Sequence, residues 1–362
     1  MVMTIVYLIG GLVLLVAGAE VLVRGAARLA GIFGISPLVI GLTVVAFGTS
    51  SPEMAVSVQS AYAGKGDIAI GNVIGSNIFN VLFILGLSAM IIPLVVSRQL
   101  IRLDVPVMLG ASVLVVALAF DGQLGRFDGA ILFGLVIIYT TYLVISSRKE
   151  QAAAASDEFV DEYGLREKPG QFAWLVNVAF IAVGLALLLL GSDFLVTGAV
   201  DLARAFGLSE LVIGLTVIAA GTSMPEVATS VMAAIKGERD IAVGNVVGSN
   251  IFNLLSVLGL ASLVSPIPLS VSPSALAFDF PVMIAVALAC LPIFFSGYVI
   301  NRWEGLLFFA YYIAYTAYVV MSATEAPMTA QFTDAMVWFI LPLTAVTLLV
   351  VGVRSLQAQR HS

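Results

Sequence analysis

Long apolar stretches recur along the whole chain and are separated by short polar turns. Eleven of them are candidate membrane spans, at approximately 4–30, 36–62, 68–93, 103–120, 127–146, 172–203, 209–235, 241–265, 277–296, 303–322 and 332–353. A helix needs about 20 apolar residues to cross a hydrocarbon core, whereas a barrel strand needs about ten residues of alternating pattern, which this sequence lacks. Because lipid-exposed backbone must form its hydrogen bonds internally, the pattern predicts an all-α polytopic membrane protein.

One hydrophilic stretch, residues 147–171, interrupts the apolar pattern. It combines an alanine run with many charged residues and is typical of a solvated linker or a short surface helix. We therefore predict a first five-helix repeat at 1–146, a cytoplasmic acidic linker at 147–171, a second five-helix repeat at 172–322, and an extra C-terminal transmembrane helix with a basic tail at 323–362. No separate soluble domain is expected.

The two halves of the chain are related by an internal duplication. Residues 39–87 align with residues 212–260 at a constant offset of 173, and 33 of the 49 aligned pairs are identical. Five spans precede the linker, and an odd number makes the second copy enter the membrane from the opposite side. Inverted repeats of this kind are typical of secondary transporters, whose sites lie near the membrane midplane between the copies.

The distribution of basic residues predicts the orientation. With the N-terminus outside, only Lys65, Arg126 and Arg204 of the 16 basic residues fall on the outer side. The other 13 fall inside: Arg24, Arg28, Arg98, Arg102, Arg148, Lys149, Arg166, Lys168, Lys236, Arg239, Arg302, Arg354 and Arg360. This asymmetry follows the positive-inside rule, and a miscounted helix would scramble it. It therefore supports both the span count and an N-terminus outside a prokaryotic cytoplasmic membrane.

Composition agrees with the pattern. Hydrophobic residues make up 60% of the 362 residues, charged residues only 10%, and the mean hydropathy is +1.10, so there is too little polar surface to cover soluble domains. Much of the net charge of −6 comes from the acidic linker, and no nucleic-acid partner is expected. The single cysteine, Cys290, lies in an apolar run and forms no internal disulfide. Although Ala17-Gly18-Ala19 imitates a signal-peptide cleavage site, no Lys or Arg precedes it, so we expect the first helix to be retained.

Four polar clusters interrupt the apolar spans, two in each repeat. They are Gly48-Thr49-Ser50-Ser51-Pro52-Glu53, Gly75-Ser76-Asn77-Ile78-Phe79-Asn80, Gly221-Thr222-Ser223-Met224-Pro225-Glu226 and Gly248-Ser249-Asn250-Ile251-Phe252-Asn253. Proline and glycine at membrane depth break a helix and free carbonyls, which must then meet a cavity, another helix or an ion. Each repeat therefore supplies a helix break and an acid together.

The spacing within the clusters brings oxygen atoms onto shared helix faces. Thr49, Ser50 and Glu53 are three and four residues apart, as are their counterparts in the second repeat, and Ser76 and Asn80 are four apart. Carboxylates, hydroxyls, amides and carbonyls, with no imidazole or thiolate nearby, suit hard cations such as Ca²⁺ or Na⁺ and argue against zinc or copper. Small residues also serve close helix packing alone, which is the competing interpretation for any single Ser, Thr or Gly.

The buried acids differ in what they predict. Glu53 and Glu226 lie mid-span without a basic partner, and a charge there is costly enough to indicate function. The other acids are expected at helix ends or as caps: Glu20, Asp193, Asp67, Asp240, Asp104 and Asp279. Two asparagines, Asn72 and Asn245, would either line the pathway or bond to loosened backbone, and the sequence does not choose between these roles.

The four clusters resemble the two alpha-repeats of the calcium/cation antiporter superfamily, specifically its prokaryotic sodium/calcium exchanger branch. The resemblance covers residues 1–322. It rests on Gly-Thr-Ser-x-Pro-Glu followed by Gly-Ser-Asn-Ile-Phe-Asn, a pair of motifs that occurs once in each repeat, with Ser51 and Met224 at the variable position x. It implies a ten-helix fold in which spans two, three, seven and eight form the ion sites while spans one and six slide across them. The span at 332–353 lies beyond these ten.

The resemblance also implies a set of ion ligands. The calcium site would use Glu53, Glu226, Thr49 and Thr222, the sodium sites would add Ser50, Ser76, Ser223, Ser249 and the carbonyls of Ala46 and Ala219, and Asn80 and Asn253 would line the middle. Some members carry Asp at the position of Asn253, and this substitution is associated with potassium-dependent relatives. We therefore expect exchange that is independent of potassium.

The resulting expectation is an electrogenic antiporter that exchanges Na⁺ for Ca²⁺ by alternating access at a shared two-glutamate site. It would be no enzyme and need no cofactor, and its partners would be lipid and the two ions, with no obligate protein partner. A proton/calcium exchanger is the nearest alternative, since a carboxylate removed from water binds a proton more readily. That branch resembles Gly-Asn-x-x-Glu and tends to use a pathway histidine, whereas the only histidine here is His361. A passive cation channel or a non-transporting scaffold is the alternative from another class.

Overall fold

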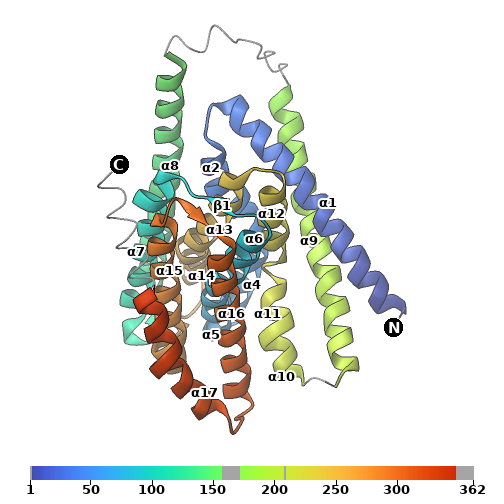
Figure 1. The fold of residues 1–362 in the computed structure, drawn as a ribbon, viewed down its shortest axis with the longest axis vertical. Coiled ribbons are helices and arrows are strands. Elements are labelled where there is room, and N and C mark those ends of the chain that lie inside the picture. Colours follow the sequence, from blue (N-terminus) through green and yellow to red (C-terminus); the bar gives the residue numbers. More distant parts are fainter. Residues whose placement is uncertain (1, 157–171, 208, 348–362) are drawn as a thin grey trace.

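The protein is a bundle of long helices in which the second and third spans of each repeat lie at the centre. The computed structural model describes residues 2–156, 172–207 and 209–347 (Figure 1). Within this part, nine helices are long and apolar enough to cross a membrane, and one bent pair counts as a tenth. The helical composition and these spans confirm the expected all-α polytopic membrane fold.

The second span of each repeat is broken. The first copy comprises α2 (Pro37–Ile40), a π-helical turn η1 (Gly41–Val45), α3 (Ala46–Thr49) and α4 (Ser51–Tyr62), and it bends by 47° at the break. Its counterpart comprises α10 (Glu210–Ile213), η6 (Gly214–Ile218), α11 (Ala219–Gly221) and α12 (Met224–Ile235). Pro52 and Pro225 occupy the first turn of the second half in each case, where a missing N–H costs nothing. The predicted breaks therefore occur at the polar clusters.

The third span of each repeat is the most buried. It runs through α5 (Gly66–Phe79), η2 (Asn80–Leu85) and α6 (Gly86–Ile91) in the first repeat, and through α13 (Arg239–Phe252), η7 (Asn253–Val257) and α14 (Leu258–Val264) in the second. In their most apolar windows 72% and 89% of the residues are buried, against 28% for the first helix, which fixes them as the centre of the bundle. Both change from α to π geometry at an asparagine, and such turns are frequent at functional sites.

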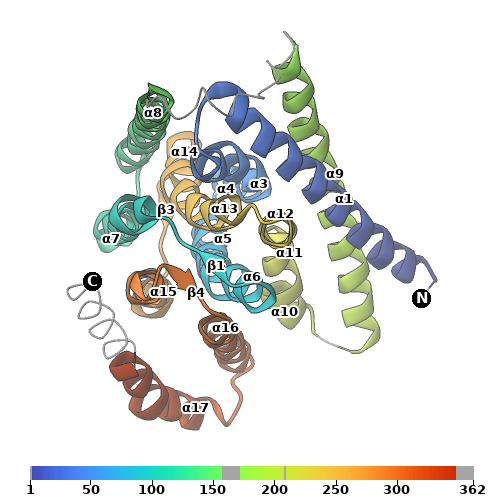
Figure 2. The ribbon, with the colours of Figure 1, turned by 45° about the horizontal axis from the view of Figure 1, so that its top comes forward.

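The first and sixth spans form an antiparallel pair at the edge of the bundle. These helices, α1 (Val2–Phe33) and α9 (Ala173–Ala205), lie side by side in both views (Figures 1 and 2). Glycines recur every seven residues on both helices, and a Cβ added to Gly18 would lie 2.8 Å from the carbonyl oxygen of Gly184. Such small residues allow close backbone contact between membrane helices, so the pair is packed as one unit.

The remaining spans surround the centre on the opposite side. In the first repeat, one span comprises η3 (Leu100–Asp104), α7 (Val105–Leu118) and η4 (Ala119–Asp121), and the next is α8 (Arg126–Ser156). In the second repeat, one span comprises η8 (Ala275–Asp279) and α15 (Phe280–Phe295), and the next is α16 (Arg302–Ala323). Helix α8 extends into the first part of the predicted linker, and the rest of that linker, 157–171, lies outside the described residues. The proposed domain boundaries therefore stay a prediction.

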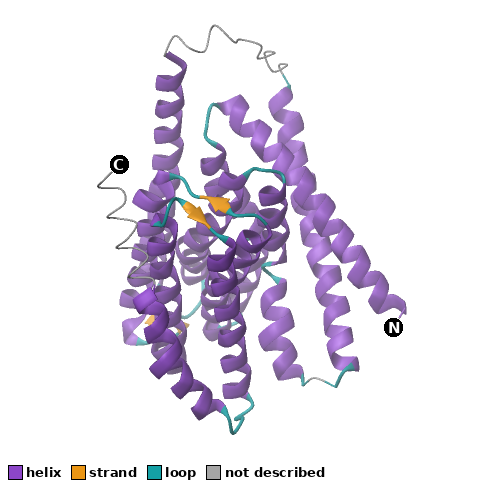
Figure 3. Ribbon diagram, in the orientation of Figure 1, coloured by secondary structure: helices purple, strands orange, loops and turns teal. Residues whose placement is uncertain are grey.

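Two short antiparallel strand pairs connect the repeats. Strand β1 (Leu94–Val95) pairs with β4 (Val299–Ile300), and β2 (Gln123–Leu124) pairs with β3 (Leu269–Ser270), as Figure 3 shows in orange. Each pair joins a loop of one repeat to a loop of the other, in the arrangement expected for an inverted duplication. The apolar periodicity did not predict these strands, because two residues are too few to show a pattern.

An eleventh helix follows the second repeat. It begins with α17 (Thr329–Ala335) and η9 (Met336–Ile340), and the helix continues to Thr347 with enough length and apolar character to span a membrane. The Tyr311 hydroxyl on α16 donates a hydrogen bond to Thr344, which ties the two helices together. The predicted end at 353 lies outside the described residues, and a membrane crossing here stays a prediction.

We predict that the C-terminus is cytoplasmic, since an eleventh crossing from an external N-terminus ends inside and the tail carries Arg354 and Arg360. A cysteine introduced at Ser362, in a Cys290→Ala background, should react with an impermeant maleimide only after the cells are permeabilised. A cysteine in place of Lys65, predicted outside, serves as the accessible control. Labelling of Ser362→Cys in intact cells would show that the helix does not cross.

Candidate ion-binding site

The two mid-span glutamates lie where the broken spans meet at the centre of the bundle. Glu53 is in the first turn of α4 and Glu226 is in the first turn of α12, and both are fully buried. The unpaired N–H groups of a helix N-terminus favour negative charge. Because each break creates a new helix N-terminus and the glutamate lies in its first turn, these N–H groups stabilise the carboxylate. The local sequence therefore places both acids at positions that can hold them in the membrane.

Each carboxylate accepts a hydrogen bond from the break in the other repeat. The Ser223 hydroxyl donates to Glu53 Oε1 at 2.7 Å, and the Ser50 hydroxyl donates to Glu226 Oε1 at 3.1 Å. Ser223 Oγ also lies 3.3 Å from Ser76 Oγ, which brings α5 into the same cluster. The site is thus a single structure shared by the two repeats rather than two separate ones.

Several oxygens of this cluster are buried without a hydrogen-bond partner among the described residues. They are Glu53 Oε2, Glu226 Oε2, Ser249 Oγ, Asn80 Oδ1 and Asn253 Oδ1. In the described part of the chain neither glutamate forms an ion pair with Lys or Arg. Buried polar atoms are normally satisfied, and a buried carboxylate without a counter-charge is costly. An all-oxygen set of this kind suits a hard cation.

The two threonines of the predicted set have different environments. Thr49 is fully buried, and its hydroxyl lies 3.1 Å from Asn245 Oδ1 on α13. Thr222 is only partly buried, in the turn between α11 and α12, and its hydroxyl lies 3.5 Å from the carbonyl of Ala219. The two residues predicted to bind sodium through their backbone carbonyls differ in the same way, since Ala46 is buried and Ala219 is exposed. The structure therefore closes the first-repeat side of the site more tightly than the second.

Three glycines show how far this asymmetry extends. Cβ atoms added to Gly41, Gly244 and Gly248 would meet backbone atoms of the other repeat at 3.0, 2.9 and 2.7 Å, so η1 and α13 are in close contact. Their repeat counterparts, Gly214, Gly71 and Gly75, would meet nothing within 4 Å. Hence η6 is separated from α5, and this looser side faces the end of the molecule that holds the N-terminus (Figure 1).

The two asparagines whose role the sequence left open bond to backbone. Asn72 Nδ2 donates to the carbonyl of Glu53 and to Ser57 Oγ, and Asn245 Nδ2 makes the equivalent bonds to Glu226 and Ser230. Each therefore satisfies a carbonyl in the first turn after a break and holds that turn against the neighbouring helix. This supports the backbone-bonding alternative for both asparagines.

The expected helix-end role is wrong for Glu20 and Asp193. Both lie in the interior of long continuous helices, because the neighbouring glycines serve close packing between α1 and α9 rather than turns. Asp67 and Asp240 do lie in the first turns of α5 and α13.

Asp104 and Asp279 each lie where a π-helical turn passes into an α-helix, inside a continuous span. Each accepts a hydrogen bond from a tyrosine hydroxyl, that of Tyr139 or that of Tyr315. They are therefore tied to neighbouring spans and are not helix caps.

Sequence reasoning assigned no role to Asn77 and Asn250, which the structure places beside the predicted ligands. Asn250 Oδ1 accepts a hydrogen bond from Asn80 Nδ2 at 3.0 Å, and Asn77 Oδ1 accepts one from Asn253 Nδ2 at 3.2 Å. Both asparagines stand directly after a predicted ligand serine in the repeated motif, so their duplication was a signal that could have identified them.

Comparison with known proteins agrees with this architecture. The model of the family described as sodium/calcium exchanger protein matches residues 3–145 and 176–321. This chain belongs to that family. Among sodium/calcium exchanger relatives, MaX1 of Methanosarcina acetivorans is 33% identical over 334 residues, covering 84% of this chain and 95% of the relative. The inner membrane protein YrbG of Escherichia coli is 41% identical over 283 residues, covering 78% and 85%.

A solved structure of the sodium-calcium exchanger NCX_Mj shares the fold, with a TM-score of 0.74 and 32% sequence identity over 87% of this chain and 98% of that one. The family and this match confirm the prokaryotic branch of the calcium/cation antiporter superfamily. The protein is an integral membrane antiporter of calcium and another cation, and it is a transporter rather than an enzyme.

Proposed function

We propose that this protein exchanges Na⁺ for Ca²⁺ at one site built around Glu53 and Glu226. The observation that carries the proposal is the reciprocal pairing of each buried carboxylate with a serine of the other repeat, which leaves one oxygen of each acid unpartnered among the described residues. Hydroxyls of Thr49, Thr222, Ser76 and Ser249, amide oxygens of Asn80 and Asn253, and carbonyls of Ala46 and Ala219 complete the ligand set.

The charge of the site explains why two kinds of ion would exchange there. Two carboxylates carry a charge near −2, which either one Ca²⁺ or two Na⁺ neutralise. Unit charges about 4 Å apart interact by about 4 kcal/mol at an effective dielectric of about 20, so an empty, doubly charged site moves through its cycle reluctantly. A loaded site moves more readily, which couples the flux of one ion to that of the other. A third Na⁺ at the serines would make each cycle electrogenic.

The unequal packing of the two repeats supports alternating access. The contacts at Gly41, Gly244 and Gly248 close one side of the site, and the open positions of Gly214, Gly71 and Gly75 leave the inverted contacts unmade. Because the repeats are inverted copies, exchanging these two packings would open the site to the opposite face while the glutamates stay in place. By the orientation predicted from the basic residues, the side opened here is the outer one.

Competition between the two ions tests the shared site. Purified protein in detergent should bind ⁴⁵Ca²⁺, and added Na⁺ should displace it competitively, with an apparent Ca²⁺ affinity that falls as a power of Na⁺ concentration between one and three. Choline in place of Na⁺ is the control for ionic strength. Calcium binding that Na⁺ leaves unchanged would exclude a shared site.

We also predict that exchange needs no potassium. Asn253 brings an uncharged amide to the site, so the cluster lacks a third carboxylate that would demand another cation. Uptake of Ca²⁺ in proteoliposomes should be equal, within about twofold, in potassium and in choline media. Asn253→Asp, which adds that charge, provides the comparison and should become sensitive to potassium. Wild-type uptake that stops without potassium would contradict the prediction.

A further inference from the structure

Four asparagine side chains cross-link the third spans of the two repeats. Asn77 and Asn80 come from the α5–η2 segment, and Asn250 and Asn253 come from the α13–η7 segment. All four are buried, at most 3% exposed. Asn80 and Asn253 belong to the proposed ligand set, whereas Asn77 and Asn250 form no hydrogen bond with either glutamate among the described residues.

A backbone carbonyl fixes which end of each amide donates. Asn77 Nδ2 lies 3.4 Å from the carbonyl oxygen of Asn250, and Asn250 Nδ2 lies 3.4 Å from that of Asn77. A carbonyl only accepts hydrogen bonds, so the NH₂ groups must face these two atoms. A second acceptor supports this orientation, because a methionine sulfur lies on the same side, Met283 Sδ at 3.8 Å and Met108 Sδ at 3.4 Å.

The orientation of these two amides determines the orientation of the amides of Asn80 and Asn253. With its NH₂ group committed, Asn77 presents Oδ1 to Asn253, which must answer with its own NH₂ at 3.2 Å. Asn250 Oδ1 imposes the same on Asn80 at 3.0 Å. The remaining atoms, Asn80 Oδ1 and Asn253 Oδ1, are buried without partners among the described residues. Both ligand amides therefore offer an oxygen and hide the nitrogen.

We propose that Asn77 and Asn250 are positioning residues that keep the amide oxygens of Asn253 and Asn80 directed at the transported cation. The inference rests on the proposed function, in which Asn80 and Asn253 line the ion site. An amide that rotated by half a turn would present NH₂, a donor that repels a cation. The two relays are equivalent by the repeat symmetry, so each should contribute a similar share.

Leucine substitution tests the relay. Asn77→Leu and Asn250→Leu keep the branched shape of the side chain and remove the hydrogen bonds, and each should weaken ⁴⁵Ca²⁺ binding by about tenfold, since a buried bond of this kind is worth roughly a tenfold change in affinity. In transport, the apparent Michaelis constant for Ca²⁺ should rise more than the maximal rate falls. Ser88→Ala removes an unpartnered buried hydroxyl from the same span and should bind Ca²⁺ like the wild type. Wild-type binding by both leucine variants would overturn the proposal.

A double substitution separates positioning from a merely structural role. If Asn77 acts on the ion only through Asn253, Asn77→Leu should weaken Ca²⁺ binding much less in an Asn253→Ala background than in the wild type, because effects that pass through one shared group are not additive. A merely structural role would weaken binding equally in both backgrounds. Equal losses in the two backgrounds would therefore contradict the relay. A wild type that binds Ca²⁺ but ignores Na⁺ would refute sodium coupling alone, while one that binds no Ca²⁺ would refute both proposals.

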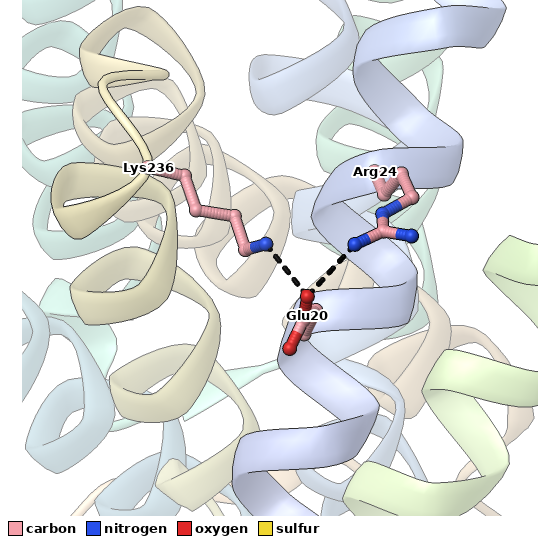
Figure 4. Close-up of polar contacts among 3 residues, drawn as sticks. All are labelled: Glu20, Arg24 and Lys236. Atoms are coloured by element: carbon pink, nitrogen blue, oxygen red, sulfur yellow. Dashed lines mark hydrogen bonds and ion pairs between the residues drawn. The ribbon is translucent and has the colours of Figure 1, made fainter.

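An ion pair connects the α1–α9 helix pair at the edge with the central bundle. Lys236 Nζ, at the end of α12, lies 2.8 Å from Glu20 Oε1 on α1, and Arg24 Nη2 lies 2.9 Å from the same oxygen (Figure 4). Helix α1 packs along α12. By repeat symmetry the counterpart of Glu20 is Asp193 on α9, which has no comparable packing against α4 in the described part of the chain.

A lysine that could pair with Asp193 lies on the predicted outer side of the membrane. Lys65 lies in the turn after α4, two residues beyond the position equivalent to Lys236, and both Lys65 and Asp193 are exposed without an ion pair among the described residues. We infer that the ion pairs alternate: Glu20 with Lys236 in the conformation described, and Asp193 with Lys65 when the site opens to the other face. An exposed ion pair shifts an equilibrium by about fivefold at most, which biases a conformation without trapping it.

Cross-linking with a cleavable bis-maleimide, whose spacer can bridge the distance between two ion-pair positions, tests the alternation in a Cys290→Ala background. The pairs Glu20→Cys with Lys236→Cys and Asp193→Cys with Lys65→Cys should each cross-link, and each cross-link should stop Ca²⁺ exchange until the spacer is cleaved. Lys236→Gln should raise the rate of cross-linking at 65 and 193 by up to about fivefold, whereas Arg302→Gln, at the start of α16 and outside both ion pairs, should not. Failure of the 65 and 193 pair to cross-link during active exchange would overturn the inference.

Discussion

Replacing either central glutamate by glutamine is expected to abolish Ca²⁺ exchange while the protein still folds. Glu53→Gln or Glu226→Gln keeps the shape and halves the charge of the site. Losing one member of a buried charge interaction typically costs about 3–5 kcal/mol, which corresponds to a loss of at least about a hundredfold in Ca²⁺ affinity. The ion-free protein should be as stable as the wild type or more so, because a buried charge without a counter-charge has been removed.

Sodium-driven ⁴⁵Ca²⁺ uptake by purified protein in liposomes measures this effect, with thermal unfolding in detergent as the check on folding. Glu304→Gln is the matched control, since Glu304 is a buried acid that caps α16 and lies outside the site. It should retain exchange. Uptake above about a tenth of the wild-type rate in Glu53→Gln would show that the carboxylate pair is not the coupling site.

Adding one methyl group at Gly75 is expected to stop transport without disturbing the conformation described. A Cβ at Gly75 meets nothing within 4 Å, whereas one at its counterpart Gly248 would lie 2.7 Å from Leu42 Cα. Gly75→Ala should therefore fold normally and bind Ca²⁺ from the open side. It should obstruct the inverted packing, and overpacking of about 1–3 kcal/mol corresponds to a transport rate lowered about five- to hundredfold.

Ca²⁺ binding and Ca²⁺ uptake, measured on the same preparation, separate the two effects. Gly110→Ala is the matched control, because that helical glycine is also in open space but lies on α7, away from the site. It should change neither measurement. Transport by Gly75→Ala at the wild-type rate would show that the contacts around Gly248 have no inverted counterpart in the cycle.

The span pattern and the duplicated motifs were sufficient to predict the helical membrane fold and the cluster of oxygen ligands. A mid-span acid after a Pro-containing break, present twice, has few explanations, and the structure brings Glu53 and Glu226 to one place. Thr222 and Ala219 could not be distinguished from Thr49 and Ala46 by sequence, because the two copies share the same motif. Their different exposure results from how α10 to α12 pack in one conformation. Because the repeated sequence is compatible with two packings, it cannot predict which of them the structure adopts.

Contacts between distant segments were the other part that sequence could not predict. The Asn77–Asn253 bond and the Glu20–Lys236 pair connect residues far apart in the chain, and nothing local to either residue indicates its partner. Glu20 was misassigned for that reason: glycine neighbours suggest a turn, yet at seven-residue spacing they serve the contact between α1 and α9. The repeat alignment, applied to every polar residue rather than to the acids, would have identified Asn77 and Asn250.

The most direct test of the central claim is the choice of driving ion in proteoliposomes. Vesicles loaded with Na⁺ and diluted into Na⁺-free medium containing ⁴⁵Ca²⁺ should accumulate Ca²⁺, and valinomycin with an inside-negative or inside-positive potassium potential should change the rate if three Na⁺ move per Ca²⁺. A proton gradient of equal size without Na⁺ should drive no uptake. Accumulation driven by protons and indifferent to Na⁺, or Ca²⁺ entry that needs no opposing cation at all, would contradict sodium/calcium exchange.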